Sequence, residues 1–446
     1  MENILAFLPL ITLIVLALIT RKMTGSIVTA VFLAMLFLHK KHILSGTIEA
    51  FYDTLTNSSF QFCLILIILF GGIIELFQQS GALQGFGNLI SGYAKGQKKI
   101  MILAWFMSAL MFVDEYLNSI TVTFSMRDIT DRNGIPREHL AFQSHTMACC
   151  LCAAVPFTSW IGFSLSLVKD YGMGFEEYVK AIPLMFYPLL MILMTLLIAA
   201  GIVPKLGNLR KAYMRVKEGG PAFLDEGMEN LVDIGSVEAA KPSSAINALL
   251  PIAVLVAGVL ICDNDLIYGL ILALMCQFVL YIPQKLMTIS EFFETFFNGA
   301  KGMTTIGIVV FLGFTLSAAN KELGFFDIVT GGVGGSVPPV LIPIISFLLT
   351  AFCVFAVGGC WVVMLITMPI FLPLAIASGA SVSLTVAAVM SGICLGYSLC
   401  FYADTVFMCT AGTGVSNITI IRTIFPYAAI AGILSCLGFT VCGLLM

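Results

Sequence analysis

The sequence has few charged residues and none of the common motifs of soluble enzymes. Of its 446 residues, 11% are charged and 59% are hydrophobic, with a mean hydropathy of +1.02. It contains no Walker-type phosphate loop and no basic patch interleaved with aromatics, which argues against nucleotide hydrolysis and nucleic-acid binding. This composition lies far outside that of soluble domains and predicts an all-α integral membrane protein in a lipid bilayer.

The cysteine pattern does not suggest a metal or disulfide framework. The 13 cysteines lie mostly inside apolar runs, as in the stretch CCLC at 149–152, with no polar ligand close by in sequence. Such residues are expected to pack as small hydrophobic side chains, and no cofactor is expected.

Long apolar segments recur along the whole chain. A segment of about 20 apolar residues crosses a hydrocarbon core of roughly 30 Å. The first segment has neither a basic leader nor a small-residue cleavage site, so we expect a retained helix and not a signal peptide. Segments of suitable length are 4–19, 60–77, 182–203, 246–262, 266–283 and 424–446.

The positions of lysine and arginine favour one threading through a cell membrane. We let 100–126 and 340–376 form re-entrant hairpins, and every other apolar segment cross the bilayer. Most basic residues then lie on the cytoplasmic side, as membrane proteins prefer. Both termini come out extracytoplasmic, in what we expect to be a prokaryotic inner membrane. The basic residues left outside are Lys40, Lys41, Lys169, Lys180 and Lys321.

The two halves of the chain resemble each other. TIEAFYDTLTNS at 47–58 aligns with TISEFFETFFNG at 288–299, and both read as amphipathic surface helices. In the threading above they lie on opposite sides, which predicts an inverted-topology repeat. The repeats are 1–203 and 246–446, and the polar segment 204–245 is expected to be a cytoplasmic linker. About ten transmembrane helices, two hairpins and two interrupted helices result.

Four helix breaks are predicted at membrane depth, where non-helical backbone must line a cavity or be covered by protein. The hairpin tips are 114–119 and 357–361, and the interrupted helices break at 154–160 and 400–405. Two hairpin tips that meet two broken helices form the kind of substrate site found in secondary transporters.

Ionisable residues inside the membrane are functional candidates because they are costly in lipid. The candidates are Glu75, Asp114, Glu115, His145 and Asp404. Asp114 is preferred over Glu115, because adjacent helical residues point about 100° apart. Glu75 also fits interfacial water, and His145 fits an ordinary hydrogen-bonded helix residue.

Oxygen ligands near these breaks suit a hard cation such as Na+. A carboxylate removed from water holds either a proton or a cation, and competition between the two produces exchange. We assign Na+ itself to Asp114, Asn118 and Asp404. The wider set of predicted substrate- or ion-binding residues is Asp114, Glu115, Asn118, Ser119, Thr158, Ser159, Gly358, Gly359, Trp361, Tyr402, Asp404 and Thr405.

Several of these motifs resemble those of NhaC-type Na+/H+ antiporters, of the ion transporter superfamily. DEYLNS at 114–119, MRDITD at 126–131 and PFTSW at 156–160 are similar to the DDYFNS, MRPITD and PISSW typical of that family. Residues 358–361 and 404–405 look like degraded forms of its TGTSWG and SDTT. The resemblance covers nearly the whole chain and implies a secondary transporter, often dimeric, with elevator-like movement of the hairpin domain.

The chain also departs from the family pattern. Ser144 and Tyr397 stand where many relatives carry acids, and the second hairpin tip lacks hydroxyls. Sodium- or proton-coupled exchange of a small organic carboxylate or amino acid is therefore the main alternative, with a pocket enlarged by Trp361, Tyr397, Phe401 and Tyr402. A channel is less expected, because repeat inversion serves alternating access. An intramembrane aspartyl protease is disfavoured, since the GxGD pattern is absent.

The surface part of the first motif has a simpler interpretation. The charges of the connection after the first hairpin alternate in sign, so they are expected to form solvated pairs that secure the loop. The residues are Arg127, Asp128, Asp131, Arg132 and Arg137.

Overall fold

The computed structural model describes residues 2–20, 23–82, 85, 96–223, 242–262, 265–325, 328 and 337–446. Throughout these residues the regular structure is helical, which confirms the all-α prediction. Seven of the described helices are long and apolar enough to cross a membrane, or eight if one bent pair forms a single span. Three further apolar helices are shorter, so the total of about ten crossings stays a prediction.

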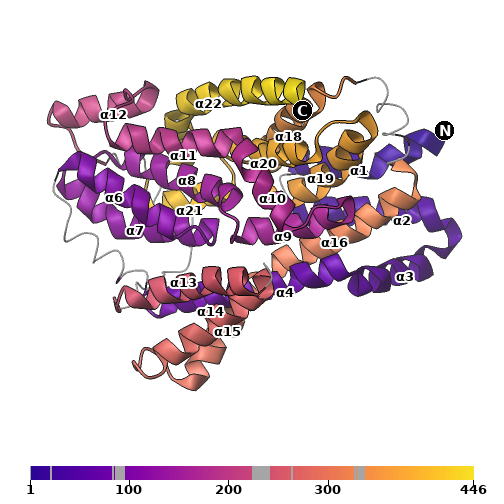
Figure 1. Ribbon diagram of the computed structural model, residues 1–446, viewed down its shortest axis with the longest axis horizontal. Coiled ribbons are helices and arrows are strands. Elements are labelled where there is room, and N and C mark those ends of the chain that lie inside the picture. Colours follow the sequence, from indigo (N-terminus) through magenta and orange to yellow (C-terminus); the bar gives the residue numbers. More distant parts are fainter. Residues whose placement is uncertain are drawn as a thin grey trace.

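The first half is a series of helices joined by short connections (Figure 1). In chain order these are α1 (Glu2–Thr20), α2 (Met23–His39), η1 (Lys40–His42), α3 (Ile43–Thr56), α4 (Ser58–Gln79), α6 (Gln97–Leu110), α7 (Glu115–Arg132), α8 (Arg137–Ala154), α9 (Ser159–Val168), η2 (Lys169–Tyr171), α10 (Phe175–Ala181), η3 (Ile182–Leu184) and α11 (Phe186–Ala199).

The second half repeats the order of helix types. After α12 (Gly207–Lys217) come α13 (Ile246–Ile261), α14 (Leu266–Tyr281), α15 (Ile289–Gly302), α16 (Thr304–Glu322), α18 (Leu341–Val357), α19 (Cys360–Ser378), α20 (Val382–Leu399), α21 (Asp404–Thr413) and α22 (Asn417–Leu445). Each half contains two apolar helices, an amphipathic helix, a further apolar helix, a hairpin and an interrupted helix. This order agrees with a repeat, and the inversion across a bilayer stays a prediction.

Three of the four helix breaks lie where the sequence predicts them, whereas the first hairpin tip ends at Asp114, because residues 115–119 of the predicted tip form the start of α7. Helix ends leave 111–114 and 358–359 as the hairpin tips and 155–158 and 400–403 as the interruptions. Pro156 lies in one interruption, where a residue without a backbone N–H and with a fixed φ disfavours a continuous helix.

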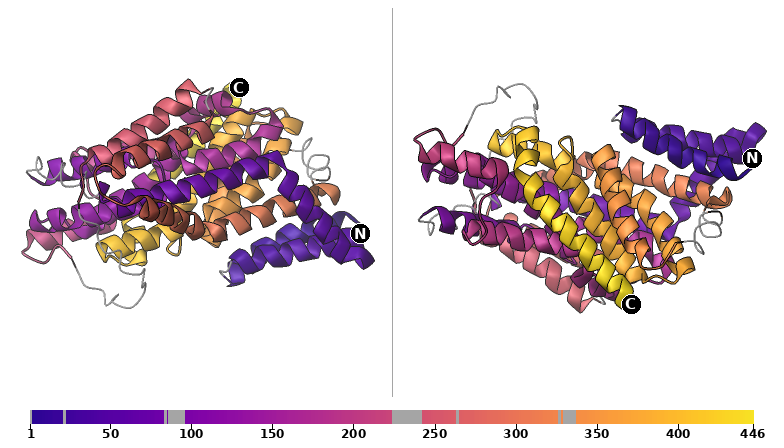
Figure 2. Two further views of the ribbon diagram at one scale, coloured as in Figure 1. Left: turned by 90° about the horizontal axis from the view of Figure 1, so that it is seen from below. Right: turned by 90° about the horizontal axis from the view of Figure 1, so that it is seen from above.

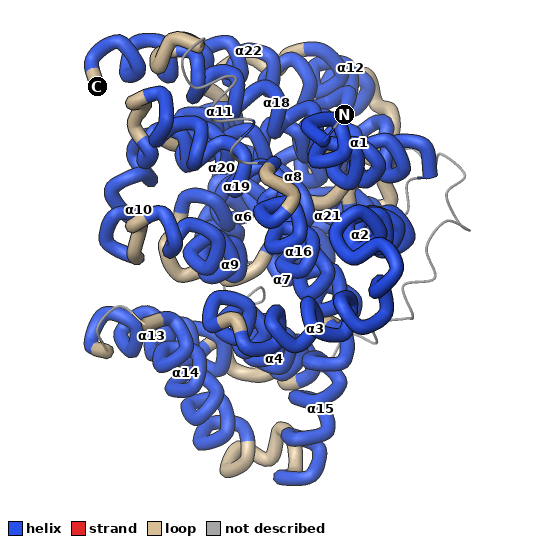
Figure 3. Tube along the Cα trace, turned by 90° about the vertical axis from the view of Figure 1, so that its right-hand side faces the viewer, coloured by secondary structure: helices blue, strands red, loops and turns tan. Residues whose placement is uncertain are grey.

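In each half, one helix packs against helices of the other half. Helix α4 of the first half contacts α14 and α15, whereas α16 of the second half contacts α2 and α3. Two glycines allow the closest approach, because a Cβ on Gly299 would lie 2.2 Å from the carbonyl oxygen of Gly71. Figure 3 shows α4, α13, α14 and α15 together on one side of the molecule, and we call them the lateral group.

A central bundle, α6–α11 with α18–α22, forms the other side (Figures 2 and 3). Its largest buried cluster combines residues of both halves, including Phe142, Phe347, Tyr397 and Tyr427. Helix α20 is surrounded, and buried residues occupy nearly every position along it. Both interrupted helices are therefore fixed within one shared core.

The described part of the predicted linker is attached to this bundle. The Arg215 guanidinium on α12 forms a two-point ion pair with Glu138 at the start of α8, with an Nη1–Oε1 distance of 2.8 Å. Asn208 donates to Thr423 on α22 at 2.9 Å. Most of the acidic part of the linker lies at 224–241, outside the described residues, so its role stays a prediction.

Four of the five charged residues after the first tip form two ion pairs, but Arg127, Asp128, Asp131 and Arg132 lie on α7 and not in a loop as predicted. Arg127 binds Asp128 at 3.3 Å and Arg137 binds Asp131 at 2.6 Å. Both pairs are partly exposed, and Arg137 also donates to the carbonyl of Thr413. These contacts fasten the connection to the end of α21.

Candidate functional site

The second arm of each hairpin packs against the second piece of the interrupted helix from the other half. Helix α7 contacts α21, and α9 contacts α19. The rings of Phe163 and Trp361 meet edge to face in the latter pair, with centroids 5.0 Å apart. The amide of Ser159 also donates to the carbonyl of Val113 at 3.1 Å, which joins the first hairpin tip to the first interruption.

Asp114 connects the first hairpin tip to the first interrupted helix. It is the N-cap of α7, with extended backbone, and its Oδ1 accepts from the amides of Tyr116 at 2.9 Å and Leu117 at 3.2 Å. Its Oδ2 accepts from the hydroxyl of Ser159 at 3.1 Å. Only 1% of the residue is exposed. A capping carboxylate at a helix N-terminus is stabilised by the free amides and by the helix dipole.

Glu115 is buried beside it and lacks full hydrogen bonding. Its Oε2 accepts a weak bond from the Cys152 thiol at 3.8 Å, and its Oε1 has no partner among the described residues. An ionised oxygen buried without a donor is costly, so this arrangement favours a bound proton or cation.

The preference for Asp114 over Glu115 assumed that both residues lie within a helix. Asp114 precedes the helix in an extended conformation, with φ −153° and ψ 144°, so the helical spacing does not apply to the pair. Both carboxylates are consequently buried, in different hydrogen-bonded surroundings.

Asp404 is joined to the first hairpin through Tyr116. The Tyr116 hydroxyl donates to Asp404 Oδ2 at 2.6 Å, and the amide of Thr405 donates to Oδ1 at 2.8 Å. Thr405 Oγ1 accepts from the Cys149 thiol at 3.6 Å. Tyr116 thus contacts Asp114 through its backbone and Asp404 through its side chain. Tyr116 was not among the predicted site residues, although its place within DEYLNS was a signal.

The three carboxylates have no basic partner in the part of the chain that the structure describes. Ion pairs there join Arg127 to Asp128, Arg137 to Asp131, Lys180 to Glu176 and Arg215 to Glu138. No described group of three or more His, Cys, Asp or Glu residues is arranged to hold a resident metal. When these acids are ionised, no basic side chain among the described residues neutralises their charge.

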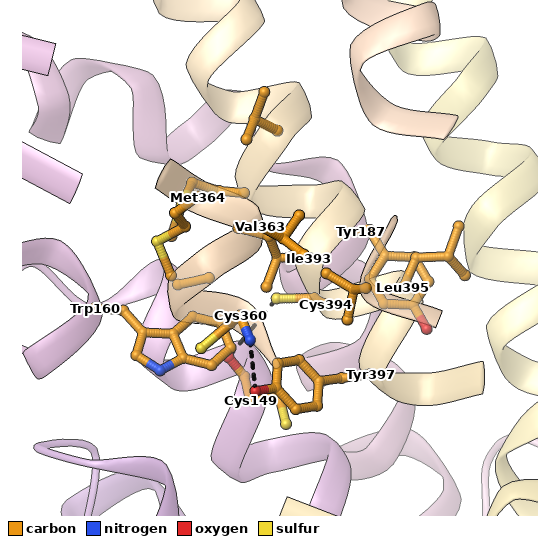
Figure 4. Packing of buried hydrophobic residues seen from close by; sticks show 14 of the residues in the cluster. Cys149, Trp160, Tyr187, Cys360, Val363, Met364, Ile393, Cys394, Leu395 and Tyr397 are labelled. Atoms are coloured by element: carbon orange, nitrogen blue, oxygen red, sulfur yellow. Dashed lines mark hydrogen bonds between the residues drawn. The ribbon is translucent and has the colours of Figure 1, made fainter. Parts of the chain in front are cut away.

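The second hairpin tip is built differently. Gly358 has a φ of +79°, in the left-handed region, and Gly359 is an N-cap without a side-chain bond. The amide of Cys360 instead donates to the Tyr397 hydroxyl at 3.0 Å (Figure 4). The Tyr397 ring stacks on Trp160 with centroids 5.7 Å apart. Tyr397 therefore accepts a helix-terminal amide at the second tip, as the Asp114 carboxylate does at the first.

A small cavity lies between the helix breaks and the neighbouring helices. Its volume is about 20 Å³, and its polar lining comes from Asp114 and Ser159. Trp361 lines it as well, and its indole Nε1 has no described partner. Helix α4 and the start of α16 close the other side, through Cys63, Leu66, Ile67, Phe70, Met303 and Ile306. The cavity thus has room for a very small solute.

Several predicted residues lie near this cavity without lining it. Thr158 is the N-cap of α9 and donates to the carbonyl of Cys152 at 2.7 Å. Asn118 Nδ2 donates to the carbonyl of Ser108 at 2.7 Å, while Asn118 Oδ1 and Ser119 Oγ are buried without described partners. Asp404 and Asn118 are not among the lining residues, so the proposed Na+ ligands do not share this cavity.

The aromatic residues expected to enlarge the pocket have other contacts. Of the four, only Trp361 lines the cavity. Tyr397 is buried in the stack on Trp160, Phe401 is 37% exposed, and the Tyr402 hydroxyl donates to the carbonyl of Phe355. An enlarged pocket is therefore not present at this cavity.

The two remaining ionisable candidates, Glu75 and His145, make no hydrogen bond to Asp114, Glu115 or Asp404 within the described residues. Glu75 accepts from Gln79 at 2.9 Å, and it packs against Gly299 of α15. His145 is buried, and its Nε2 is 3.1 Å from the carbonyl oxygen of Tyr397. Both fit the plainer interpretation, a surface-facing acid and a hydrogen-bonded helix residue.

This fold and its buried acidic cluster at paired helix breaks are those of a secondary membrane transporter. The fold is similar to that of the YdaH transporter of Alcanivorax borkumensis, with a TM-score of 0.60, 14% identity, and 90% of this chain and 88% of that one covered. It is also similar to MtrF of Neisseria gonorrhoeae, which represents a class of antimetabolite efflux pumps, with a TM-score of 0.51 and 14% identity over 90% and 83% of the chains.

Sequence comparison identifies the family. Residues 151–444 match the model of the Na+/H+ antiporter family, and the chain belongs to that family. An uncharacterized protein of Haemophilus influenzae is 21% identical over 490 aligned positions, covering 99% of this chain and 91% of that protein. The chain is accordingly a transporter and not an enzyme.

Proposed function

We propose that the protein exchanges Na+ for H+ across a prokaryotic inner membrane, by alternating access of the cluster of Asp114, Glu115 and Asp404. The observation that supports this most is that Asp114 and Glu115 are buried and that none of the three acids has a basic partner in the described residues. Asp404 is only partly exposed. Acids in such surroundings are stabilised by a proton or by a cation, and each excludes the other.

The chemistry of the cluster supports a specific division of roles. Asp114 already accepts three hydrogen bonds, so it can hold a negative charge toward a cation in the small cavity. Glu115 has one oxygen without a donor, which favours a proton there. Tyr116 joins Asp114 to Asp404, so that occupancy of one of these two acids would affect the other.

Alternating access requires relative movement, and the arrangement suggests which parts move. The cavity has Asp114, Ser159 and Trp361 of the central bundle on one side and α4 with the start of α16 on the other. We propose that the central bundle slides along α4 and α16 like an elevator, within a homodimer of inverted repeats. Both termini would then lie outside the cell.

One observation favours the alternative, which is sodium- or proton-coupled exchange of a small organic carboxylate or amino acid. Trp361 lines the cavity, and its buried indole Nε1, which has no described partner, is a donor that suits a carboxylate oxygen. A cavity of about 20 Å³ accommodates such a solute only after opening.

Purified protein in liposomes with an internal pH dye tests the proposal. A Na+ gradient should drive proton movement in the wild type, and Asp404→Asn should abolish it. Asp128→Asn is the matched control, because Asp128 lies on α7 but its side chain is 67% exposed. If wild-type protein moves no protons under a Na+ gradient, but takes up a labelled carboxylate or amino acid, the alternative replaces the proposal.

A further inference from the structure

A second cavity lies farther along the same helices as the small one. It has a volume of about 350 Å³, and its polar lining residues are Ser59, Ser166, Lys169 and Asp265. Lys169 and the N-terminal end of α4 lie on the side that the charge pattern predicts to be outside. Asp265 is the N-cap of α14, with Oδ1 accepting from the amide of Ile267 at 2.8 Å. We call this space the outer cavity.

The outer cavity and the small cavity follow one seam, between α4 and α9. On α4, Ser59 and Phe62 line the outer cavity, and Leu66 lines the small one. On α9, Ser166 lines the outer cavity, and Ser159 lines the small one. The two spaces are thus successive along both helices, and Asp114 lies at the inner end.

A narrow layer of small side chains separates the two cavities. The Cys63 thiol on α4 is 3.0 Å from the Ser166 hydroxyl on α9, and both are buried. Next to this contact α9 approaches α4 at Gly162, where a Cβ would lie 2.5 Å from Leu66 Cδ1. Side chains this small leave a polar opening if α4 and α9 separate slightly.

We propose that the outer cavity is the vestibule through which the transported cation reaches Asp114 from outside, and that the Cys63–Ser166 contact is its closed point. This inference rests on the proposed function for the identity of the cation. Asp265, which is partly buried, gives the vestibule a carboxylate that attracts a cation, and Lys169, which also lines it, is exposed to solvent. In this conformation the pathway is closed between the two cavities.

A reversible cross-link tests the closed point. In Ser166→Cys, the new thiol replaces a hydroxyl 3.0 Å from the native Cys63 thiol, so oxidation should form a disulfide with little backbone movement. We expect oxidised Ser166→Cys in liposomes to lose Na+-driven proton movement and to regain it on reduction. The matched control is the double variant Cys63→Ala with Ser166→Cys, whose activity should be the same before and after oxidation. Undiminished transport by protein shown by mass spectrometry to carry the disulfide between Cys63 and the introduced thiol overturns the proposal.

A second measurement does not depend on Na+/H+ exchange. Cys63 is 1% exposed here, so its reaction with a membrane-impermeant, charged methanethiosulfonate reports opening of the seam to water. We expect labelling of Cys63, quantified by mass spectrometry, from the outer side only. Labelling without any Na+-driven proton movement would retain the vestibule and reject the proposed substrate. Labelling by lipid-soluble reagents alone would show a lipid-facing groove and reject the vestibule.

Discussion

The two hairpin tips reach similar geometry with different chemistry. At the first tip the Asp114 side chain caps α7 and contacts Ser159, and the acids cluster around it. At the second tip Gly358 has a left-handed backbone conformation, and the Tyr397 hydroxyl on α20 accepts a hydrogen bond from the amide of Cys360. The first tip thus combines helix capping with a carboxylate, whereas the second tip is capped by a neutral hydroxyl. The carboxylate of the first tip is therefore not repeated at the second, and the second half contributes its acid, Asp404, from the interrupted helix instead.

The largest expected effect is on transport, from Asp114→Asn. Asparagine still caps a helix, so the free energy of unfolding should change little, by less than about 1 kcal/mol. The negative charge toward the cavity is lost, and Na+-driven proton movement should fall to the level of empty liposomes. Asp114→Ala should lose both transport and the cap. An active Asp114→Asn would remove the functional distinction between the tips.

The next effect is on stability, from Tyr116→Phe. Loss of the hydroxyl leaves an Asp404 oxygen without its donor, and hydrogen bonds to charged groups contribute about 1.5–3 kcal/mol. The thermal unfolding temperature of the purified protein in detergent should therefore fall clearly. An unchanged unfolding temperature would show that water replaces the hydroxyl at Asp404.

At the second tip, adjacent glycines should differ in their tolerance of alanine. Gly358→Ala places a side chain at φ +79°, which costs about 1–2 kcal/mol, and its Cβ would lie 3.0 Å from the Tyr402 ring. Gly359 has extended backbone and no atom near its virtual Cβ, so Gly359→Ala is the matched control and should unfold like the wild type. Equal unfolding temperatures for the two variants would contradict the described turn.

The smallest expected effect is that of Tyr402→Phe. Its hydroxyl donates to a neutral carbonyl, that of Phe355, and such bonds contribute about 0.5–1.5 kcal/mol. The unfolding temperature should fall less than in Tyr116→Phe, and the pH dependence of transport should stay the same. A changed pH dependence would mean that the second tip takes part in ion binding.

Much of this architecture is predictable from local sequence. The apolar segments, three of the four breaks and the two amphipathic helices at 43–56 and 289–302 appear where the sequence indicates them, and the first hairpin tip lies a few residues before its predicted position. Local patterns suffice because helix length, breaks and amphipathicity depend on residues near in sequence. The positions of Asp114, Ser159 and Trp361 on one cavity also agree with the predicted junction of breaks.

Other features of the site depend on contacts between distant residues. The Tyr116–Asp404 bond spans 288 positions, and the Cys63–Ser166 contact spans 103. The role of Tyr397 could not be predicted from the residues next to it in sequence, because its hydroxyl accepts a hydrogen bond from the Cys360 amide of another helix. The hydrophobic periodicity of a sequence does not specify hydrogen-bond partners that lie far apart in the chain.

The sequence by itself determined that this is a helical membrane protein, where its helices break, and which acids lie at those breaks. These properties follow from hydrophobicity and from backbone preferences, which act over a few residues. Only the tertiary structure decided that both Asp114 and Glu115 are buried, that Tyr116 reaches Asp404, and that Tyr397 caps the second hairpin. Each depends on how helices from the two halves pack, because burial and hydrogen-bond partners are set by the approach of distant segments.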